Sequence, residues 1–395
     1  MPDTLIALRA PSANRVYAHA AGALALEEAR WVLGARLDRI PQLREIRVGG
    51  MDAIQAHDPD GLDELAPRLL ASLSGTLGVL EVVEPAEPAG QPLLRPLDPP
   101  RPEQHPSDLE TTLRYPGKTN EQFTALLIAV AAALSTRADR LEDGSLALLD
   151  PMCGRGTTLN RALRIGLSPI GADLDRKDVE AYGAFLTTWL RRQRYKHTAS
   201  TGKLTVHRTQ LGPRYDAEFA IDKDAQRTGR TQRVIVLGCD TAQLPRVLPA
   251  ASIDVIVADL PYGVQHGARA GERLSRSPLE ALRAAAPGWR SLLRDGAGVA
   301  LALNRRTLAH EDAVVVLADA GLQVVSADGA FRHRVDQAIE RDIVLAVPAE
   351  HPRLAALRAL GAPDVLPASA TSTDLHEQTD LHEQPDVHEQ TRTGS

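Results

Sequence analysis

Seven short apolar runs from residue 146 onward limit the fold of the chain more than any other feature of the sequence. Most of them are continuously apolar instead of alternating, and segments with helical apolar spacing separate them. A strand that is apolar on both faces is covered on both faces, which favours a parallel sheet between helices. We therefore predict a doubly wound, mostly parallel seven-stranded α/β sheet with its ligand at the carboxyl ends of the strands. The predicted strands are residues 146–150, 169–174, 234–239, 255–259, 299–304, 322–327 and 343–347.

The remaining sequence divides into an N-terminal segment, a linker and a tail around the predicted sheet domain. Residues 1–85 combine short β-branched runs with a helical apolar pattern, which predicts a small α/β accessory domain with RNA binding as its candidate role. Prolines then recur every few residues, so we predict a linker at 86–108 and the sheet domain at 109–350. Residues 351–395 end in hexapeptides that share His-Glu-Gln, which predicts a largely disordered tail.

Charge and cysteine content limit where such a protein acts and on what. The formal net charge of −6 argues against a surface coated in basic charge, although a local basic patch is compatible with it. The two cysteines, Cys153 and Cys239, are too few for a disulfide framework and fit a reducing compartment. No apolar run reaches the length of a membrane span, and the histidines of the tail repeats do not share a helix face. We expect a cytoplasmic protein without a metal or a membrane partner.

A glycine-containing loop follows the first predicted strand. The strand ends in Asp150, and the chain continues through Cys153, Gly154 and Gly156 to a predicted helix that begins near Thr157. Glycines let the backbone approach a ligand closely, and a helix start presents free N–H groups. The loop lacks the lysine of a phosphate loop and the third glycine of the dinucleotide fingerprint. Alone, it is also compatible with an ordinary turn.

Acidic residues end the next two predicted strands. Asp173 lies about 20 residues after the loop, where a carboxylate accepts hydrogen bonds from ribose hydroxyls, and Leu174 beside it is placed against adenine. Asp240, followed by Thr241, ends the third strand and is placed at the exocyclic amine of adenine. Each acid could instead cap a helix. Because the carboxyl ends of parallel strands meet at one edge, the acids together favour a nucleoside pocket.

The fourth predicted strand leads into Asp259-Leu-Pro-Tyr-Gly263. An aryl amine is a poor nucleophile because its lone pair is delocalised into the ring, so it needs alignment more than a strong base. A carboxylate and a backbone carbonyl that accept its N–H bonds can turn the lone pair toward an electrophilic methyl group, while a ring stacks on the base. Asp259 and Tyr262 supply the acid and the ring, and Pro261 stiffens the turn.

The four segments Asp150-Pro-Met-Cys-Gly-Arg-Gly156, Gly171-Ala-Asp-Leu-Asp175, Cys239-Asp-Thr241 and Asp259-Leu-Pro-Tyr-Gly263 resemble, in this order, the class I amino-methyltransferases that use S-adenosylmethionine. The resemblance is strongest to the tRNA guanine-N2 methyltransferases, which often carry an N-terminal THUMP-type RNA-binding module. It implies a Rossmann-like class I methyltransferase domain with S-adenosylmethionine as its cofactor. The cofactor residues that it implies are Asp150, Cys153, Gly154, Gly156, Thr157, Asp173, Leu174, Asp240, Thr241 and Asp259.

The segment from Tyr115 to Thr124 also resembles one that this family places before its first strand, against the methionine part of the cofactor. This adds Phe123 and Thr124 to the implied cofactor residues. The sequence departs from the family in two ways. Leu260 stands where the family usually has the first proline of Asp-Pro-Pro-Tyr, and residues 1–85 show no THUMP pattern.

Two basic segments are candidates for contact with a nucleic acid. His266, Arg269 and Arg273 follow the catalytic loop closely and are predicted to bind substrate together with Tyr262. Basic residues between the second and third strands, interleaved with Tyr195 and Tyr215, form a second patch that is nearly as compatible with an ordinary solvated surface.

The sequence therefore favours an N-methyltransferase that acts on an exocyclic amine of a nucleobase, with guanine N2 in tRNA as the first candidate and tRNA as the partner. Three alternatives remain at this point. They are a DNA adenine or cytosine amino-methyltransferase, a small-molecule or peptide N-methyltransferase, and a non-catalytic subunit that binds S-adenosylmethionine.

Overall fold

The computed structural model contains the predicted mostly parallel sheet, and it describes residues 1–12, 14–83, 92–115, 117–261 and 277–362. All seven predicted strands form, and β12, β11, β6, β7 and β10 are parallel neighbours in this order. Strand β15 joins β12 antiparallel, and β13 pairs with β15 at the edge. These strands are β6 (Leu148–Asp150), β7 (Ile170–Asp173), β10 (Gln232–Gly238), β11 (Ile253–Asp259), β12 (Leu293–Asn304), β13 (Leu322–Val324) and β15 (Glu340–Pro348).

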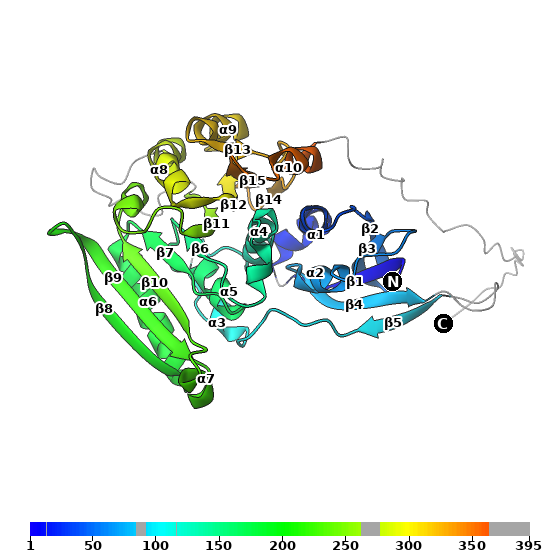
Figure 1. Cartoon of the computed structure of the whole chain (residues 1–395), viewed down its shortest axis with the longest axis horizontal. Helices are drawn as coiled ribbons and strands as arrows, with labels where there is room; N and C mark the ends of the chain where they lie inside the picture. Colours follow the sequence, from blue (N-terminus) through cyan, green and yellow to red (C-terminus); the bar gives the residue numbers. More distant parts are fainter. Residues whose placement is uncertain (13, 84–91, 116, 262–276, 363–395) are drawn as a thin grey trace, which may run out of the picture. The chain divides into compact units, whose positions relative to one another are not determined.

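Both faces of this sheet are buried, as the continuous apolarity of the runs predicts. Along β11, Val255 and Val257 join the core that contains α4, whereas Ile256 and Ala258 join the core on the other face with α8 and α9. Figure 1 shows these two helix layers around the strands. The helices and short 3₁₀ turns of this part are α3 (Asp108–Thr111), α4 (Glu121–Leu134), η1 (Ala138–Leu141), α5 (Thr157–Arg164), α6 (Arg176–Arg192), α7 (Lys223–Arg227), η2 (Thr241–Arg246), α8 (Pro278–Leu292) and α9 (His310–Asp319).

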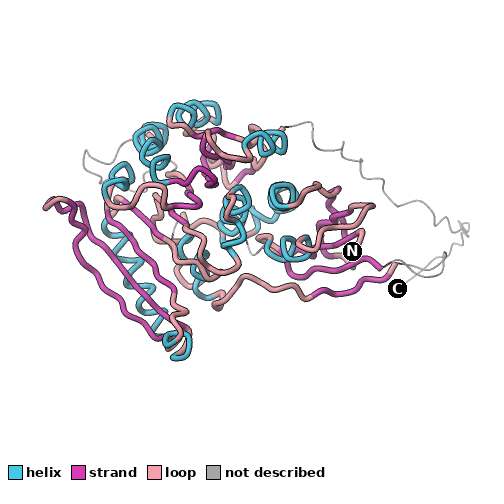
Figure 2. The backbone as a smooth tube through the Cα atoms, viewed as in Figure 1, coloured by secondary structure: helices cyan, strands magenta, loops and turns pink. Residues whose placement is uncertain are grey.

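A long hairpin that the sequence did not predict extends the sheet beyond β10. Strands β8 (Lys196–Val206) and β9 (Thr209–Ala220) pair antiparallel over eleven registered positions, and β9 continues the sheet from β10. The hairpin follows α6 along much of its length (Figure 2). Its strands are rich in threonine, lysine and charged pairs instead of continuous apolar residues, so the pattern used to find the central strands does not detect them.

The N-terminal residues form a second, antiparallel sheet with the order β2-β3-β1-β4-β5. Helices α1 and α2 pack against its strands. Its elements are β1 (Thr4–Arg9), α1 (Arg15–Arg36), β2 (Gln42–Val48), β3 (Met51–His57), α2 (Ala66–Ser72), β4 (Thr76–Val83) and β5 (Leu93–Leu97). Strand β5 falls in the segment predicted as a linker. It is an edge strand, and an edge strand tolerates Pro96 because half of its backbone groups need no sheet partner.

Helix α4 connects the two sheets through one continuous core. Asn120 caps its first turn by accepting a hydrogen bond from the N–H of Phe123 at 3.1 Å, and 11 of its 14 residues are buried. It packs against β11 and β12 on one side and α1 on the other, which explains a helix that is apolar almost all round. No helix in the described ranges is long and apolar enough to cross a membrane.

The predicted tail begins with ordered structure. Helix α10 (Leu354–Gly361) packs on α1, and its Leu360 side chain lies against Gly34. The His-Glu-Gln repeats lie outside the described residues. At the same edge of the large sheet as β13, β14 (His333–Arg334) forms a two-residue pairing with the start of β15, which matters for the site described below.

Candidate active site

The loop between β6 and α5 depends on two glycines with left-handed backbone conformations. Gly154 has φ +49° and Gly156 has φ +80°. A Cβ atom on Gly156 would also clash with the buried ring of Tyr182, so glycine is required there twice over. The loop is fixed to the next strand, because the N–H of Cys153 donates to the carbonyl of Ala172 at 2.8 Å. This brings the backbone of the loop to the carboxyl edge of the sheet.

The acids that end the strands hold this loop and its neighbours. Asp173 accepts hydrogen bonds from the N–H groups of Gly154 at 2.7 Å and Asp175 at 2.8 Å, and burial raises its pKa to about 6. Asp150 accepts from the N–H of Met152 at 3.1 Å, and burial raises its pKa to about 7. Both carboxylates lie in an environment that disfavours negative charge without a cationic or hydrogen-bonding ligand.

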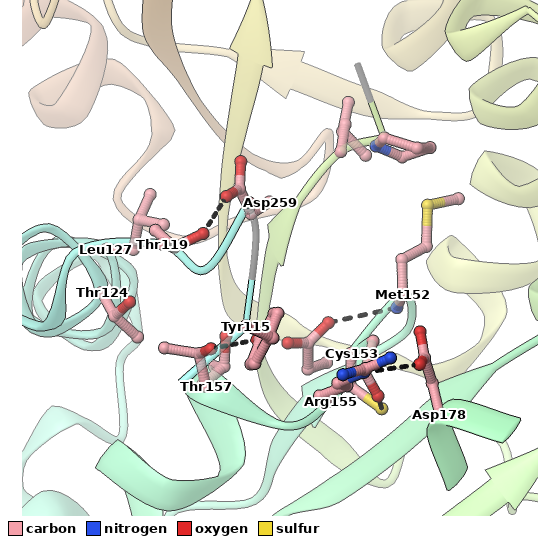
Figure 3. Close-up of a pocket in the computed structure, with 16 residues that line it drawn as sticks. Tyr115, Thr119, Thr124, Leu127, Met152, Cys153, Arg155, Thr157, Asp178 and Asp259 are labelled. Carbon is pink, nitrogen blue, oxygen red and sulfur yellow. Dashed lines mark hydrogen bonds and ion pairs between the residues drawn. The ribbon is translucent and has the colours of Figure 1, made fainter. Parts of the chain in front are cut away.

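A cavity of about 330 Å³ lies over this loop, between the carboxyl ends of β6 and β11 (Figure 3). From β6 the chain adds β7 and then β10 on one side of the sheet, and it then places β11 on the other side of β6. Such a switch point between neighbouring strands forms the ligand crevice of open α/β sheets. We call this the cofactor cavity. Of the predicted residues, those that line it are Thr124, Asp150, Cys153, Gly154, Thr157, Asp259 and Pro261.

The other predicted cofactor residues lie outside the lining. Phe123 is fully buried beneath it, and Leu174 is 51% exposed. Asp240 caps η2 by accepting from the N–H of Ala242 at 3.0 Å, and the hydroxyl of Thr241 accepts from the indole N–H of Trp289 at 2.8 Å. Gly156 and Asp173 are not in the lining, but they fix the conformation of the loop. Gly156 does so by its positive φ, and Asp173 by accepting a hydrogen bond from the N–H of Gly154. The predicted substrate residues Tyr262, His266, Arg269 and Arg273 lie outside the described residues.

The rim of the cofactor cavity contains contacts that the sequence did not reveal. The hydroxyl groups of Tyr115 and Thr157 are hydrogen-bonded at 2.8 Å, and the guanidinium of Arg155 lies 5.2 Å from the centre of the Tyr115 ring. Arg155 in turn donates to Asp178 at 2.9 Å. Figure 3 shows this chain of side chains across the mouth of the cavity. The charged residues that line the cavity are Asp150, Asp178, Asp259 and Arg155. This excess of negative charge suits a cationic ligand.

Asp259 ends β11 and is held by two residues that sequence reasoning missed. The hydroxyl of Thr119 donates to its Oδ2, and Nη2 of Arg341 approaches the same oxygen at 3.4 Å. The Arg341 guanidinium also stacks over the Phe123 ring at 4.6 Å. A buried arginine at the start of the apolar strand β15 was the available signal, because a buried charge requires a partner.

Of the two tyrosines in the second predicted basic patch, Tyr215 is not available to stack on bases. Tyr215 is 2% exposed and packs edge-on against Tyr182. Tyr195 contacts the rings of Trp189 and Phe219. The prediction of a stacking surface there is therefore wrong for Tyr215, since alternation along β9 turns its ring inward onto α6.

One group of three possible metal ligands lies away from the cofactor cavity. His310, Asp328 and Asp342 bring ligand atoms within 4.8 Å of one another. Arg305 forms ion pairs with both Asp328 and Asp342, which already compensates their charge. These contacts account for the cluster without a metal ion.

Residues 117–296 match the family described as "RMKL-like, methyltransferase domain". The match covers less than half of the chain and begins just before α4. Together with the order of the strands, this match shows a methyltransferase domain with a Rossmann-like α/β fold, of the kind that uses S-adenosylmethionine. Among curated proteins, nothing matches the sequence.

Several solved methyltransferases resemble this chain. TrmN from Thermus thermophilus has 15% identity and a TM-score of 0.34, with coverage of 87% of this chain and 99% of that one. A TehB-like enzyme from Corynebacterium glutamicum has 13% identity and a TM-score of 0.30, with coverage of 55% and 86%. The magnesium protoporphyrin IX methyltransferase of Synechocystis, solved with bound S-adenosylmethionine, has 15% identity and a TM-score of 0.32, with coverage of 59% and 86%. At these values, no substrate follows for this chain.

The residues around the cofactor cavity fit S-adenosylmethionine. Its sulfonium is cationic, and Asp150, Asp178 and Asp259 line the cavity. The two positive-φ glycines bring backbone N–H groups close to the ligand space, next to the first turn of α5. The raised pKa of Asp150 also indicates a buried carboxyl group that a nearby positive charge would stabilise in its ionised form.

Proposed function

We propose that this methyltransferase modifies an exocyclic amine of a nucleobase, with guanine N2 in tRNA as the first candidate. The observation that carries the proposal is the position of Asp259. Its carboxylate lines the cofactor cavity at the end of β11, and Leu260 and Pro261 follow it in the chain. An acid followed by Leu-Pro-Tyr supplies the acceptor and the ring that an aryl amine needs for alignment.

The chemistry assigned to the residues is orientation and acceptance of a proton. When bound, S-adenosylmethionine would supply an electrophilic methyl group. The Asp259 carboxylate accepts one N–H of the amine and turns the nitrogen lone pair toward the cofactor cavity. Thr119 and Arg341 hold the carboxylate in place by their contacts to Oδ2. The proton that the nitrogen loses on methylation passes to this carboxylate or to water.

Methyl transfer to defined nucleic acids tests the proposal. The purified full chain is incubated with deuterated-methyl S-adenosylmethionine and with unmodified tRNA, ribosomal RNA or DNA, and the products are digested to nucleosides for mass spectrometry. We expect labelled N2-methylguanosine from tRNA. A label on adenine or cytosine of DNA would support the DNA alternative, and the absence of label in every nucleoside, with S-adenosylmethionine bound in calorimetry, would contradict the proposal.

A further inference from the structure

A second cavity of about 330 Å³ is built from three segments that are far apart in the sequence. The first is the start of α1, the second is the 117–120 turn before α4, and the third is the segment from β14 to the start of β15. We call this the second cavity. Gly117 and Thr119 line both it and the cofactor cavity, so the two cavities meet at this turn.

Asp259 lies at this meeting point. Thr119 donates to Asp259 Oδ2, and Arg341, which lines the second cavity, contacts the same oxygen. A group bound in the second cavity would therefore contact Thr119 and Arg341, and these two residues contact the carboxylate of Asp259 directly. Methyl transfer requires the donor and acceptor atoms to approach closely, which makes two cavities joined at the catalytic acid a suitable arrangement.

The walls of the second cavity combine apolar surfaces with polar groups in the manner of a site for a flat heterocycle. Val16, Tyr17, Val335 and Ile339 supply the apolar part, and Asn120 lies among the polar groups. The charged lining residues are three cations, Lys118, Arg334 and Arg341, and one acid, Asp336. Carboxylates already offset two of these cations, because Lys118 pairs with Glu121 at 2.5 Å and Arg341 approaches Asp259 at 3.4 Å. The lining is still less acidic than that of the cofactor cavity, so it accommodates a ligand that carries phosphate better than the cofactor cavity does.

His333 contributes a hydrogen-bond acceptor that the protein itself does not use. Its Nδ1 lies 2.9 Å from the carbonyl oxygen of Phe331, which can only accept, so Nδ1 carries the proton. Burial lowers the pKa of His333 to about 4, which keeps the ring neutral and leaves Nε2 as an acceptor. Nε2 is buried without a hydrogen-bond partner among the described residues. A buried acceptor without a partner is costly, and a ligand N–H would satisfy it once a small movement of the ring exposes Nε2 to the cavity.

We propose that the second cavity is the substrate site for one nucleobase displaced from a polynucleotide strand, that the first turn of α1 completes its wall, and that His333 accepts a hydrogen bond from an N–H on the edge of this base. The inference rests on the proposed function and adds that the N-terminal segment takes part in substrate recognition directly. Because Val16 and His333 are 317 positions apart, this site requires the packing of α1 against the methyltransferase domain.

Blocking the cavity from its exposed wall tests the proposal without disturbing the core. Val16 is 44% exposed, so Val16→Trp adds bulk at the cavity while the helix retains its buried face. Ala18, also exposed, lies on a different side of the same helix turn and does not line the cavity, so Ala18→Trp is the matched control. We expect Val16→Trp to lower kcat/KM for the nucleic acid about 100-fold, and Ala18→Trp to change it less than about threefold.

Substitutions at His333 test the hydrogen bond. His333→Phe keeps a ring against Tyr17 and Phe123 but removes the acceptor, whereas His333→Gln keeps an amide oxygen near the position of Nε2. We expect about a tenfold loss of kcat/KM for Phe and a smaller loss for Gln. The affinity for S-adenosylmethionine, measured by calorimetry, should stay within about twofold in every variant because none of these residues lines the cofactor cavity.

Parallel assays with RNA and DNA substrates identify which polynucleotide supplies the base. If the unmodified protein methylates a nucleic acid and Val16→Trp does so as well as Ala18→Trp, the proposed substrate site is wrong while the proposed function stands. If the unmodified protein binds S-adenosylmethionine but methylates no nucleic acid, both fail. Loss of methyl transfer in Val16→Trp with intact cofactor binding supports the site.

Discussion

The two cavities that meet at the 117–120 turn, beside Asp259, are built from different kinds of structure. The cofactor cavity consists mainly of loops at one edge of one sheet, and its shape depends on backbone conformation at Gly154 and Gly156. The second cavity consists of side chains from segments joined only by tertiary packing. The first carries mostly acids and the second mostly cations.

This difference teaches where each cavity is sensitive to change. A loop that is fixed by its own backbone fails when its conformation fails, whatever happens elsewhere in the chain. In a site assembled by packing, each side chain stays intact when one element shifts, but the side chains no longer align with one another around the ligand. The cofactor cavity should therefore respond to backbone substitutions with loss of folding or of cofactor, and the second cavity to side-chain substitutions with loss of turnover alone.

Substitution of Asp259 should show the largest effect, because this residue lines the cofactor cavity and is held by two residues of the second cavity. We expect Asp259→Ala to lower the rate of methyl transfer about 10²- to 10³-fold, because the acceptor that aligns the amine is removed. Cofactor affinity should fall by no more than about threefold, since the glycine loop and the other acids of the lining remain. Single-turnover methyl transfer and calorimetry measure the two quantities. Turnover retained at the level of the unmodified protein would show that Asp259 does not hold the amine.

Next in size is a pair of backbone substitutions in the cofactor loop. Gly156→Ala places a Cβ atom against the buried Tyr182 ring at a positive φ, and we expect it to lower the free energy of unfolding by about 3 kcal/mol or more. Gly154→Ala also has a positive φ, but its Cβ meets no atom within 4 Å, so the expected cost is about 1 kcal/mol. Urea denaturation compares the two. Equal costs would mean that contact with Tyr182 does not explain the glycine at 156.

The two cavities also differ in how far the sequence alone predicts them. The continuous apolar runs and the glycine loop are local patterns, so the seven strands and the lining residues Asp150, Cys153, Gly154 and Thr157 could be predicted, whereas Met152 and Arg155 were not. The contacts of Asp259 with Thr119 and Arg341 join positions 140 and 82 residues away, and no local pattern encodes them. The same holds for the hairpin β8–β9, whose polar strands are specified by pairing with β10 and by packing on α6.

A smaller effect is expected when the hydroxyl of Thr119, which lines both cavities, is removed. Thr119→Val keeps the shape of the side chain and removes the donor to Asp259, so the carboxylate is held less well. We expect kcat to fall about tenfold with an unchanged KM for S-adenosylmethionine. Thr119→Ser restores the donor and should recover most of the activity. A variant that loses cofactor affinity instead of turnover would assign Thr119 to the cofactor cavity alone.

The last prediction concerns the stability, and not the turnover, that depends on the helix that walls the second cavity. Glu28 of α1 is buried and accepts hydrogen bonds from the N–H of Ser74 at 2.7 Å and from its hydroxyl at 2.6 Å. Burial raises its pKa from the ordinary value of 4.5 to about 7. A carboxyl group whose folded-state pKa is raised contributes stability in full below pH 4.5, loses it as the pH rises toward 7, and contributes none above that.

Glu28→Gln removes this titration, so the variant should gain stability relative to the unmodified protein by about 1–3 kcal/mol between pH 5 and pH 8. Urea denaturation of both proteins at the two pH values measures the difference, and subtraction cancels the titration of the other buried groups. Glu64 is exposed, and Glu64→Gln is the matched control with no expected change in the gap. If the difference in unfolding free energy between Glu28→Gln and the unmodified protein is the same at both pH values, the raised pKa of Glu28 is contradicted. Because α1 contributes nothing to the cofactor lining, cofactor affinity should not follow this change in stability.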